Sequence, residues 1–346
     1  MRGPGRSPSL PVVDIREIDK ADDAAMAQMY AVVVAVRTFQ RPFFQPPPLE
    51  AVLADLRHDD PGERVTVWGM HDAGELVGAV TLWESLLDNT HSLWAELDVH
   101  PDHRRRGHGA AAVAAVERFA REAGRTRIVI DARYPADRAD DHPYRRFAER
   151  HGYRLGSLGV NRRLALPLPR GRLAELDAAA RAAYEPDYRL QSFTRVPEQL
   201  AESLCACMNR VEAEAPSGEI DWEPESLTPA RLQSYHDLDV ASGRQRFTTV
   251  AQAVGSVDVV AYTELLVPAT MTRAQQSGTY VLPEHRGRRL GMAVKLANLV
   301  AVHKARPEVV EIFTGNSSAN EWMVAVNEQL GFSPVELIGE FYRRLG

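Results

Sequence analysis

Every second residue from Leu93 to Val99 is apolar, and Trp, Glu and Asp stand between them. This alternation predicts a β-strand with one buried face. From Ala112 to Ala123 apolar residues recur every three or four positions, and Gly124 follows. This spacing predicts a helix that buries one side and ends at the glycine. A strand and a helix therefore follow each other closely along the chain.

The turn that joins them is basic and contains glycine, with the sequence Arg-Arg-Arg-Gly-His-Gly at residues 104–109. A helix that begins directly after such a turn presents N–H groups without intrahelical partners. The helix dipole adds about half a positive charge at the same place. The turn is therefore suited to hold an anion such as a phosphate group.

The same pattern of residues occurs a second time in the chain. Four landmarks of the first copy recur 182 residues later, as the pairs Val99 and Val281, Pro101 and Pro283, Arg104 and Arg286, and Gly109 and Gly291. The run Leu330-Gly331-Phe332 follows His151-Gly152-Tyr153 by 179 residues. A nearly constant offset across several landmarks predicts tandem copies of one domain. We place a disordered leader at 1–10, the copies at 11–168 and 187–346, and a linker with a helical piece at 169–186.

Each copy shows the same predicted order of strands and helices. The order is a short strand, two helices, a strand hairpin, the strand before the basic turn, the helix after it, and a final strand, helix and closing strand. Strands and helices in this order predict an α+β fold with a mixed, mostly antiparallel sheet flanked by helices. The parallel join falls at the strand that leads into the basic turn.

Composition restricts the function classes. The chain has 346 residues, of which 45% are hydrophobic and 25% charged, and its net charge is −6. These values fit a soluble globular protein of two domains and argue against a general nucleic-acid binder. No apolar run is long enough for a membrane span, and the first ten residues lack the apolar core of a signal peptide. Cys205 and Cys207 are two residues apart in a predicted helix, so they form neither a metal site nor a disulfide framework. We expect a cytoplasmic protein without a metal.

The basic turn, set between a strand ending in Val-x-Pro and a helix opening with Ala-Ala-Ala, resembles the acyl-coenzyme A motif of the GNAT acetyltransferase superfamily. The resemblance covers about residues 12–345, so it implies two tandem GNAT domains that use acetyl-CoA. In that family the turn holds the pyrophosphate of the co-substrate. The residues that the resemblance assigns to acetyl-CoA binding are Val99, Arg104, Arg105, Arg106, Gly107, His108, Gly109, Ala110, Val281, Arg286, Gly287, Arg288, Arg289, Leu290, Gly291, Met292, Asn320 and Asn327.

Direct acyl transfer needs a base for the amine and an acid for the leaving thiolate. In the family the base is a carboxylate on or near the strand before the turn, and Glu96 matches it, with Asp98 on the same strand face. Two neighbouring carboxylates tend to raise one of their pKa values, which suits a base near neutral pH. The usual acid is a tyrosine four residues before the Gly-Phe of the last helix. Ala148 stands there in the first copy, so Tyr144 and Tyr153 are the nearby substitutes.

The second copy departs from the family pattern differently. Gly278 stands at the position of Glu96, so Glu264 on the preceding strand is the nearest replacement for a base. Arg289 replaces the first glycine of the turn, whereas Asn320 matches the asparagine that opens the last helix. Asn327 stands in for the tyrosine and cannot protonate a thiolate. The first copy is therefore the more complete of the two sites.

These observations predict an N-acetyltransferase that moves an acetyl group from acetyl-CoA to the amine of a small molecule by direct attack, as a monomer or homodimer. Two alternatives remain open at this point. One is a regulatory protein that binds acyl-CoA without turnover, and the other is acyl transfer to a hydroxyl or to a protein amine. The acceptor pocket is expected near 42–49 and 213–225. Phe43 and Phe44 either line it or pack in the interior, and the acidic run at 212–225 either attracts a cationic acceptor or is a solvated loop.

Overall fold

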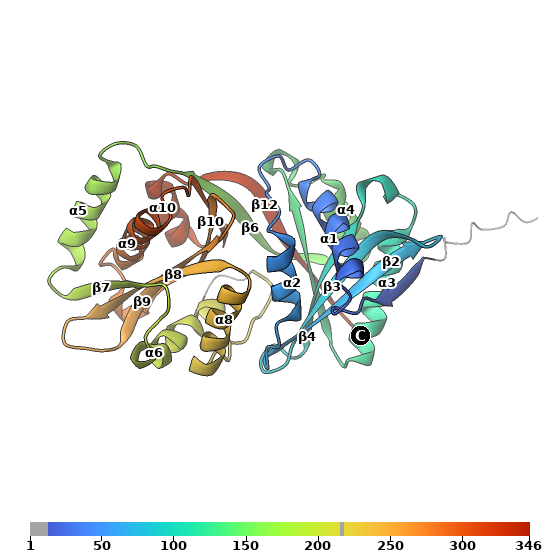
Figure 1. Cartoon of the computed structure of the whole chain (residues 1–346), viewed down its shortest axis with the longest axis horizontal. Helices are drawn as coiled ribbons and strands as arrows, with labels where there is room; N and C mark the ends of the chain where they lie inside the picture. The colour runs from blue at the N-terminus through green and yellow to red at the C-terminus, as the bar shows by residue number, and fades with distance from the viewer. Residues whose placement is uncertain (1–12, 215–217) are drawn as a thin grey trace, which may run out of the picture.

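The computed structural model describes residues 13–214 and 218–346, so the expected leader at 1–10 lies outside the described residues. The two copies lie side by side along the long axis of the molecule (Figure 1). The first copy runs through β1 (Asp14–Glu17), α1 (Asp23–Thr38), α2 (Leu49–Arg57), β2 (Glu63–Asp72), β3 (Glu75–Ser85), β4 (Ser92–Val99), α3 (His108–Glu122), β5 (Arg127–Tyr134), α4 (Pro143–Arg150) and β6 (Arg154–Ala165).

The linker holds α5 (Arg172–Tyr184), which matches the expected helical piece. The second copy then repeats the order. Its elements are β7 (Tyr188–Phe193), α6 (Glu198–Met208), α7 (Val211–Glu214), α8 (Pro229–Ala241), β8 (Arg244–Ala253), β9 (Val259–Pro268), β10 (Arg273–Val281), α9 (Leu290–Ala305), β11 (Glu311–Ser317), α10 (Glu321–Leu330) and β12 (Ser333–Arg344). Short 3₁₀ turns follow β4, β5 and β10, at Pro101–His103, Ala136–Arg138 and Pro283–His285.

The strands of both copies form one sheet of twelve strands in the order β1-β2-β3-β4-β5-β12-β6-β11-β10-β9-β8-β7. The two copies exchange their last strands in its centre. β12, from the second copy, pairs with β5 of the first copy from Leu337 to Arg344. β6, from the first copy, pairs with β11 of the second copy from Gly159 to Ala165. The two exchanged strands also pair with each other, so the copies share a continuous sheet.

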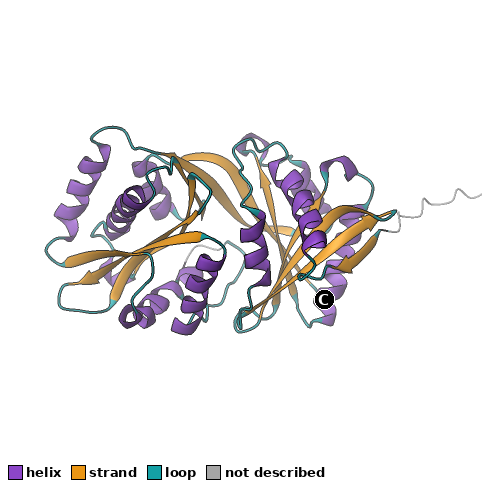
Figure 2. Cartoon of the chain, in the orientation of Figure 1, coloured by secondary structure: helices purple, strands orange, loops and turns teal. Residues whose placement is uncertain are grey.

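Helices cover both faces of this sheet in each copy (Figure 2). In the first copy α3 and α4 bury one core with Leu93 and Ile128, whereas α1 and α2 cover the opposite face around Val67 and Ala79. In the second copy α5, α9 and α10 cover the face equivalent to that of α3 and α4. α6 and α8 cover the other face, with Cys205 and Cys207 buried among them, as expected of two small interior residues.

Outside residues 1–12 and 215–217, the chain contains no helix that is long and apolar enough to span a lipid bilayer.

Candidate active site

The parallel strands separate at one point in each copy. β4 pairs with β5 only from Ser92 to Ala95, so the rest of β4, Glu96 to Val99, keeps pairing on its β3 side alone. In the second copy β10 pairs with β11 from Arg273 to Gln276 and then leaves it. A strand that leaves its neighbour exposes backbone groups to a ligand. The chain thus forms two wedge-shaped openings, each of which leads to a basic turn.

The two basic turns have the same backbone conformation but exchange glycine and arginine. In the first turn Arg105 and Gly107 have positive φ, at 65° and 92°. In the second turn the residues 182 positions later, Gly287 and Arg289, have positive φ, at 81° and 54°. Arg289 therefore does adopt the conformation that the missing glycine would provide, at a cost of about 1 kcal/mol.

The first arginine of each turn binds the end of the preceding strand. Arg104 Nε donates to the Val99 carbonyl at 3.1 Å, and Arg286 Nε donates to the Val281 carbonyl at the same distance. The Arg104 guanidinium also lies between the rings of Phe39 and Tyr144. These arginines, which the sequence assigned to pyrophosphate, therefore fix the shape of the turn with their Nε groups.

The other residues that were expected to bind acetyl-CoA divide into two groups, exposed and buried. Arg105 is exposed and has no ion pair within the described ranges, and Arg106 donates to the Asp102 carbonyl at 3.0 Å. His108 is buried, as are Leu290 and Met292 in the second copy. These three face the interior, so a contribution to anion binding falls to their backbone N–H groups. No side chain caps α3 or α9, because each follows a left-handed residue instead of a capping side chain.

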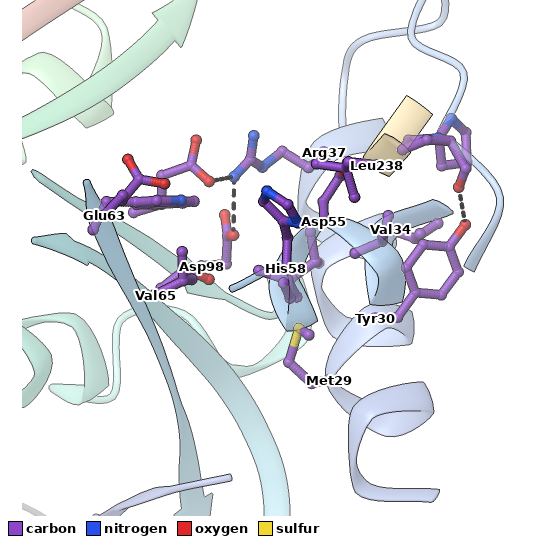
Figure 3. A pocket seen from close by; sticks show the side chains of 18 of the residues that line it. Met29, Tyr30, Val34, Arg37, Asp55, His58, Glu63, Val65, Asp98 and Leu238 are labelled. Atoms are coloured by element: carbon purple, nitrogen blue, oxygen red, sulfur yellow. Dashed lines mark hydrogen bonds and ion pairs between the residues drawn. The ribbon is translucent and has the colours of Figure 1, made fainter. Parts of the chain in front are cut away.

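Arg37, on α1, holds the two carboxylates of β4. It donates to Glu96 and lies 3.3 Å from Asp98, as the dashed lines in Figure 3 show. Arg133, on β5, lies 3.7 Å from Glu96 and 3.2 Å from Asp131. Three carboxylates therefore surround two guanidinium groups at the opening between β4 and β5.

The pKa values of these carboxylates diverge. Burial alone would raise the pKa of Glu96, but Arg37 and Arg133 outweigh it and lower that pKa. Burial raises the pKa of Asp98, and the charge of Glu96 adds to this effect against the pull of Arg37. Burial also raises the pKa of Asp131 to about 6. The group whose pKa rises within the Glu96–Asp98 pair is therefore Asp98, whereas Glu96 is ionised at neutral pH.

A cavity of about 560 Å³ opens onto these carboxylates, as Figure 3 shows. Its lining comes from α1, α2, the strands β2 to β4, and α8 of the second copy. Phe44 lines it, whereas Phe43 stacks on Phe313 of the second copy with ring centroids 6.4 Å apart. The cavity size fits a small organic molecule.

His58 is a cavity residue that the sequence did not single out. It lies just after α2, and its buried Nε2 has no hydrogen-bond partner in the part of the chain that the structure describes. A single histidine after a helix carries no sequence signal. Only the packing of α2 against α8 brings it to the cavity.

Tyr144 lies at the start of α4, close to the end of β4. Its ring faces the same Arg104 guanidinium that binds the Val99 carbonyl, at 5.4 Å. Its hydroxyl has no hydrogen-bond partner among the described residues. Tyr153, the other substitute for the family tyrosine, is buried, and burial raises its pKa well above the usual value, which makes it a poorer proton donor.

Where β10 leaves β11, at residues 277–281, the strand itself has no carboxylate, and Glu214 of α7 accepts a hydrogen bond from the Tyr280 hydroxyl there. Glu264 is 1% exposed, and its oxygens accept hydrogen bonds from Arg246 at 2.9 Å and Thr248 at 2.7 Å, so it stabilises the interior. At Gly278, the counterpart of Glu96, a Cβ would lie 2.5 Å from the Tyr262 hydroxyl. The Tyr262 ring thus occupies the space next to that strand. β10 also contains an irregularity in its pairing with β9 between Gln276 and Thr279, which β4 lacks.

The asparagines of the last helix have structural partners. Asn320 caps α10 by accepting from the Met323 N–H at 3.1 Å. Asn327 is completely buried and accepts from Lys295 Nζ at 3.2 Å, and it donates to Asn316 at 3.2 Å. Burial lowers the pKa of Lys295 to about 7. Asn327 therefore faces the α9–α10 contact rather than an open cleft.

The acidic run of the second copy contacts the first copy, although its carboxylates stay exposed. Trp222 stacks on Trp94 with ring centroids 5.8 Å apart. Glu223 accepts from the Asn89 N–H at 2.6 Å, and Glu219 accepts from the Tyr342 hydroxyl at 3.0 Å. None of residues 218–225 lines the cavity described above, and Glu219, Asp221, Glu223 and Glu225 are exposed, as a solvated loop would be. Ile220 and Trp222 nevertheless fix this run on β4, β5 and β12. Residues 215–217 lie outside the described part.

Comparison with known proteins identifies the family. The model described as the acetyltransferase (GNAT) family matches residues 32–153, which belong to the first copy. A mycothiol acetyltransferase of Saccharomonospora viridis is 31% identical over 340 residues, which cover 92% of this chain and 94% of that protein. The chain belongs to the GNAT family of acetyltransferases. It is therefore an acyltransferase, and its family uses acetyl-CoA as co-substrate.

Solved structures share the tandem GNAT fold. A tandem GNAT protein from the clavulanic acid biosynthesis pathway aligns with a TM-score of 0.76 and 24% identity, covering 96% of this chain and 99% of that chain. A GCN5-related N-acetyltransferase from Sphaerobacter thermophilus aligns with a TM-score of 0.65 and 17% identity, covering 98% of both chains. The expected fold, two tandem GNAT copies of α+β type, is confirmed.

Proposed function

We propose that this GNAT protein transfers an acetyl group from acetyl-CoA to the amine of a small molecule, and that the first copy performs the reaction. One observation carries the proposal. Glu96 and Asp98, which follow the last β4 residue paired with β5, line the cavity. An acceptor in the cavity and a donor in the strand opening would therefore meet at the same two carboxylates.

The first turn supplies the groups that an acyl-CoA needs. The uncapped N–H groups at the start of α3 and the exposed Arg105 fit a pyrophosphate. The free edge of β4 up to Val99 offers backbone groups to the pantetheine arm and to the thioester oxygen. His108 and Gly109 contribute through their backbone, which lies at the positive end of the helix dipole.

The carboxylate pair on β4 takes the proton of the attacking amine. The amine nitrogen forms the new bond to the acetyl carbon, the carbon–sulfur bond breaks, and the thiolate leaves with its electron pair. Glu96, held ionised by Arg37 and Arg133, attracts the ammonium form, and Asp98, whose pKa burial raises, binds the proton more tightly than a solvated aspartate would. The Tyr144 hydroxyl, beside the end of β4, returns a proton to the thiolate.

The second copy fits this chemistry less well, although its turn keeps the same backbone. Glu214 pairs with Arg286 at 3.1 Å and neutralises part of the charge of its turn. Gly278 stands where the first copy has Glu96, and a Cβ there would lie 2.5 Å from the Tyr262 hydroxyl. These differences support a structural or donor-binding role for the second copy without turnover.

The experiment compares Glu96→Gln and Asp98→Asn with the wild type in an assay of free-thiol release from acetyl-CoA across a panel of primary amines. We expect that loss of the proton acceptor in these variants lowers kcat by about 10²- to 10⁴-fold and leaves the affinity for acetyl-CoA unchanged. Glu122→Gln, an exposed carboxylate at the end of α3, is the matched control and retains full activity. Unchanged kcat in both variants, or no thiol release by the wild type with any amine, would contradict the proposal.

A further inference from the structure

One wall of the acceptor cavity belongs to the second copy. Tyr235 and Leu238, both on α8, line the cavity together with α1, α2 and the first-copy strands. Arg231, Tyr235 and Leu238 are four and three residues apart, so they lie on one side of the helix. The side of α8 that faces the first copy is thus the side that closes the cavity.

A buried ion pair holds this side of α8 in place. Asp60 accepts from Arg231 through both oxygens, at 3.0 and 3.1 Å, and from the Tyr235 hydroxyl at 2.8 Å. Asp60 is 9% exposed, and its Oδ1 also accepts from the Gly62 N–H at 2.7 Å. The guanidinium lies so close to Gly62 that a Cβ there would be 2.4 Å from Arg231 Cζ. A bidentate ion pair of this kind fixes the orientation of the guanidinium relative to the carboxylate as well as the distance between them.

A second ion pair joins α2 to the strand that follows α8. Arg244, the first residue of β8, binds both oxygens of Asp55 at 2.8 Å. Its Nε lies 3.2 Å from Asp239 on α8. Asp55 itself lines the cavity. Two ion pairs between the copies, Arg231–Asp60 and Arg244–Asp55, therefore set the distance between α8 and the α2 side of the cavity.

The lining of the cavity indicates the chemistry of its occupant. Many of the side chains that line the cavity are apolar, among them Met29, Val33, Val52, Leu56 and Val65. Among the described residues, five carboxylates line the cavity. Asp55 and Asp60 pair with arginines of the second copy, and Glu63 has no ion pair within the described ranges. Glu96 and Asp98 share Arg37 and Arg133 with Asp131, which leaves an excess of one negative charge where β4 leaves β5. A cationic group at that place with an apolar arm toward Leu238 matches this distribution.

We infer that the second copy sets the acceptor specificity of the first, and that the acceptor is a primary amine on an apolar arm whose length Leu238 and Tyr235 limit. The inference rests on the proposed function for the identity of the cavity as the acceptor site. It assigns Leu238 and Tyr235 a role in specificity, and Arg231 and Asp60 a positioning role. The second copy then contributes to the reaction without carrying out chemistry.

The test measures binding of straight-chain primary alkylamines, from propylamine to decylamine, to the full chain by calorimetry. Each added CH₂ tightens Kd by about 4-fold, from about 0.8 kcal/mol of burial, until the arm reaches the wall. Leu238→Trp moves this limit to shorter chains, and Leu238→Ala moves it to longer ones. Val240→Trp, on the same helix but 74% exposed, leaves the limit unchanged. Gly62→Ala displaces the Arg231 guanidinium, so that the tightening of Kd stops gradually, over several chain lengths, instead of at one length.

Equal limits in the wild type and both Leu238 variants, or a Kd in the wild type that does not depend on chain length, would overturn the inference. Melting temperatures close to that of the wild type show that the variants fold. Thiol release from acetyl-CoA with the same amines is measured separately. Binding with a movable limit but no thiol release contradicts the proposed function alone, whereas thiol release with a fixed limit contradicts the inference alone.

Discussion

At the scale of single residues, the first copy concentrates charge where β4 leaves β5. Arg37 and Arg133 hold Glu96, Asp98 and Asp131 in a half-buried group. With all five groups ionised, one negative charge is in excess. Such an arrangement keeps a carboxylate ionised inside a cavity and makes its neighbour easier to protonate.

The pH dependence of the free energy of unfolding tests the role of Asp131 in this group. Burial raises its pKa to about 6 from 3.8, so the folded protein binds the proton more tightly than the unfolded chain. Its contribution to stability is present below about pH 4 and is lost as the pH rises through about 6, because the ionised form then costs about 3 kcal/mol. Asp131→Asn removes this loss.

We expect Asp131→Asn to reduce the fall in the free energy of unfolding between pH 5 and pH 7, measured by urea denaturation at each pH. The lost ion pair with Arg133 offsets part of the gain. Asp187→Asn, an exposed carboxylate, is the control and follows the wild type. A variant that loses as much stability as the wild type over this interval would show that Asp131 is not the source.

The sequence predicted some of these residues and missed others. Glu96 and Asp98 follow from the alternation of β4, because residues two apart share a strand face. Arg37 and Arg133 do not, since their approach depends on how α1 crosses the sheet and where β5 pairs. The positions of Tyr235 and Leu238 in the cavity could not be predicted either, because no sequence pattern in α8 indicates that this helix faces the other copy.

At the scale of elements, the two strand–turn–helix units are the most predictable part of the chain. Both begin and end within a few residues of the expected positions, because alternation, proline and glycine mark their limits. The sequence also indicated that Arg289 occupies a glycine position. It did not indicate that Gly287 takes over the other left-handed position, which only the backbone angles show.

The second turn offers a pair of opposite predictions. Arg289→Gly relieves an unfavourable φ and raises the free energy of unfolding by about 0.5 to 1 kcal/mol, after the greater freedom of the unfolded chain is counted. Gly287→Ala introduces such a φ and lowers it by about 1 kcal/mol. Chemical denaturation of both variants measures the difference. Shifts of the same sign would contradict the assignment of these two positions.

At the scale of the whole molecule, the exchange of β6 and β12 makes the copies interdependent. β12 covers the edge of β5, and without it the first copy exposes a long unpaired strand edge next to its candidate site. The repeat predicted two copies and their fold, which the comparisons bear out. The exchange itself escaped prediction, because strand patterns fix neither the partner strand nor the copy that provides it.

We therefore expect that a chain cut between Pro169 and Arg170, in an exposed segment before α5, gives halves that do not fold separately. Mixed or co-expressed halves recover the native circular dichroism and elute together in gel filtration, since each supplies the strand that the other lacks. The uncut chain under the same conditions is the control. A first half that is monomeric, cooperatively folded and active by itself would contradict the dependence on β12.

The central claim is that acetyl transfer takes place in the first copy. A direct measurement is kcat/KM for acetyl-CoA in Arg105→Glu and Arg289→Glu, two exposed arginines of left-handed conformation, at the first such position of the first turn and the second such position of the second turn. Reversing the charge beside a pyrophosphate costs about 1.5 to 3 kcal/mol, or about 10- to 100-fold. We expect this loss for Arg105→Glu and wild-type turnover for Arg289→Glu. The opposite result, with activity lost only in Arg289→Glu, would place the reaction in the second copy and contradict its assignment to the first.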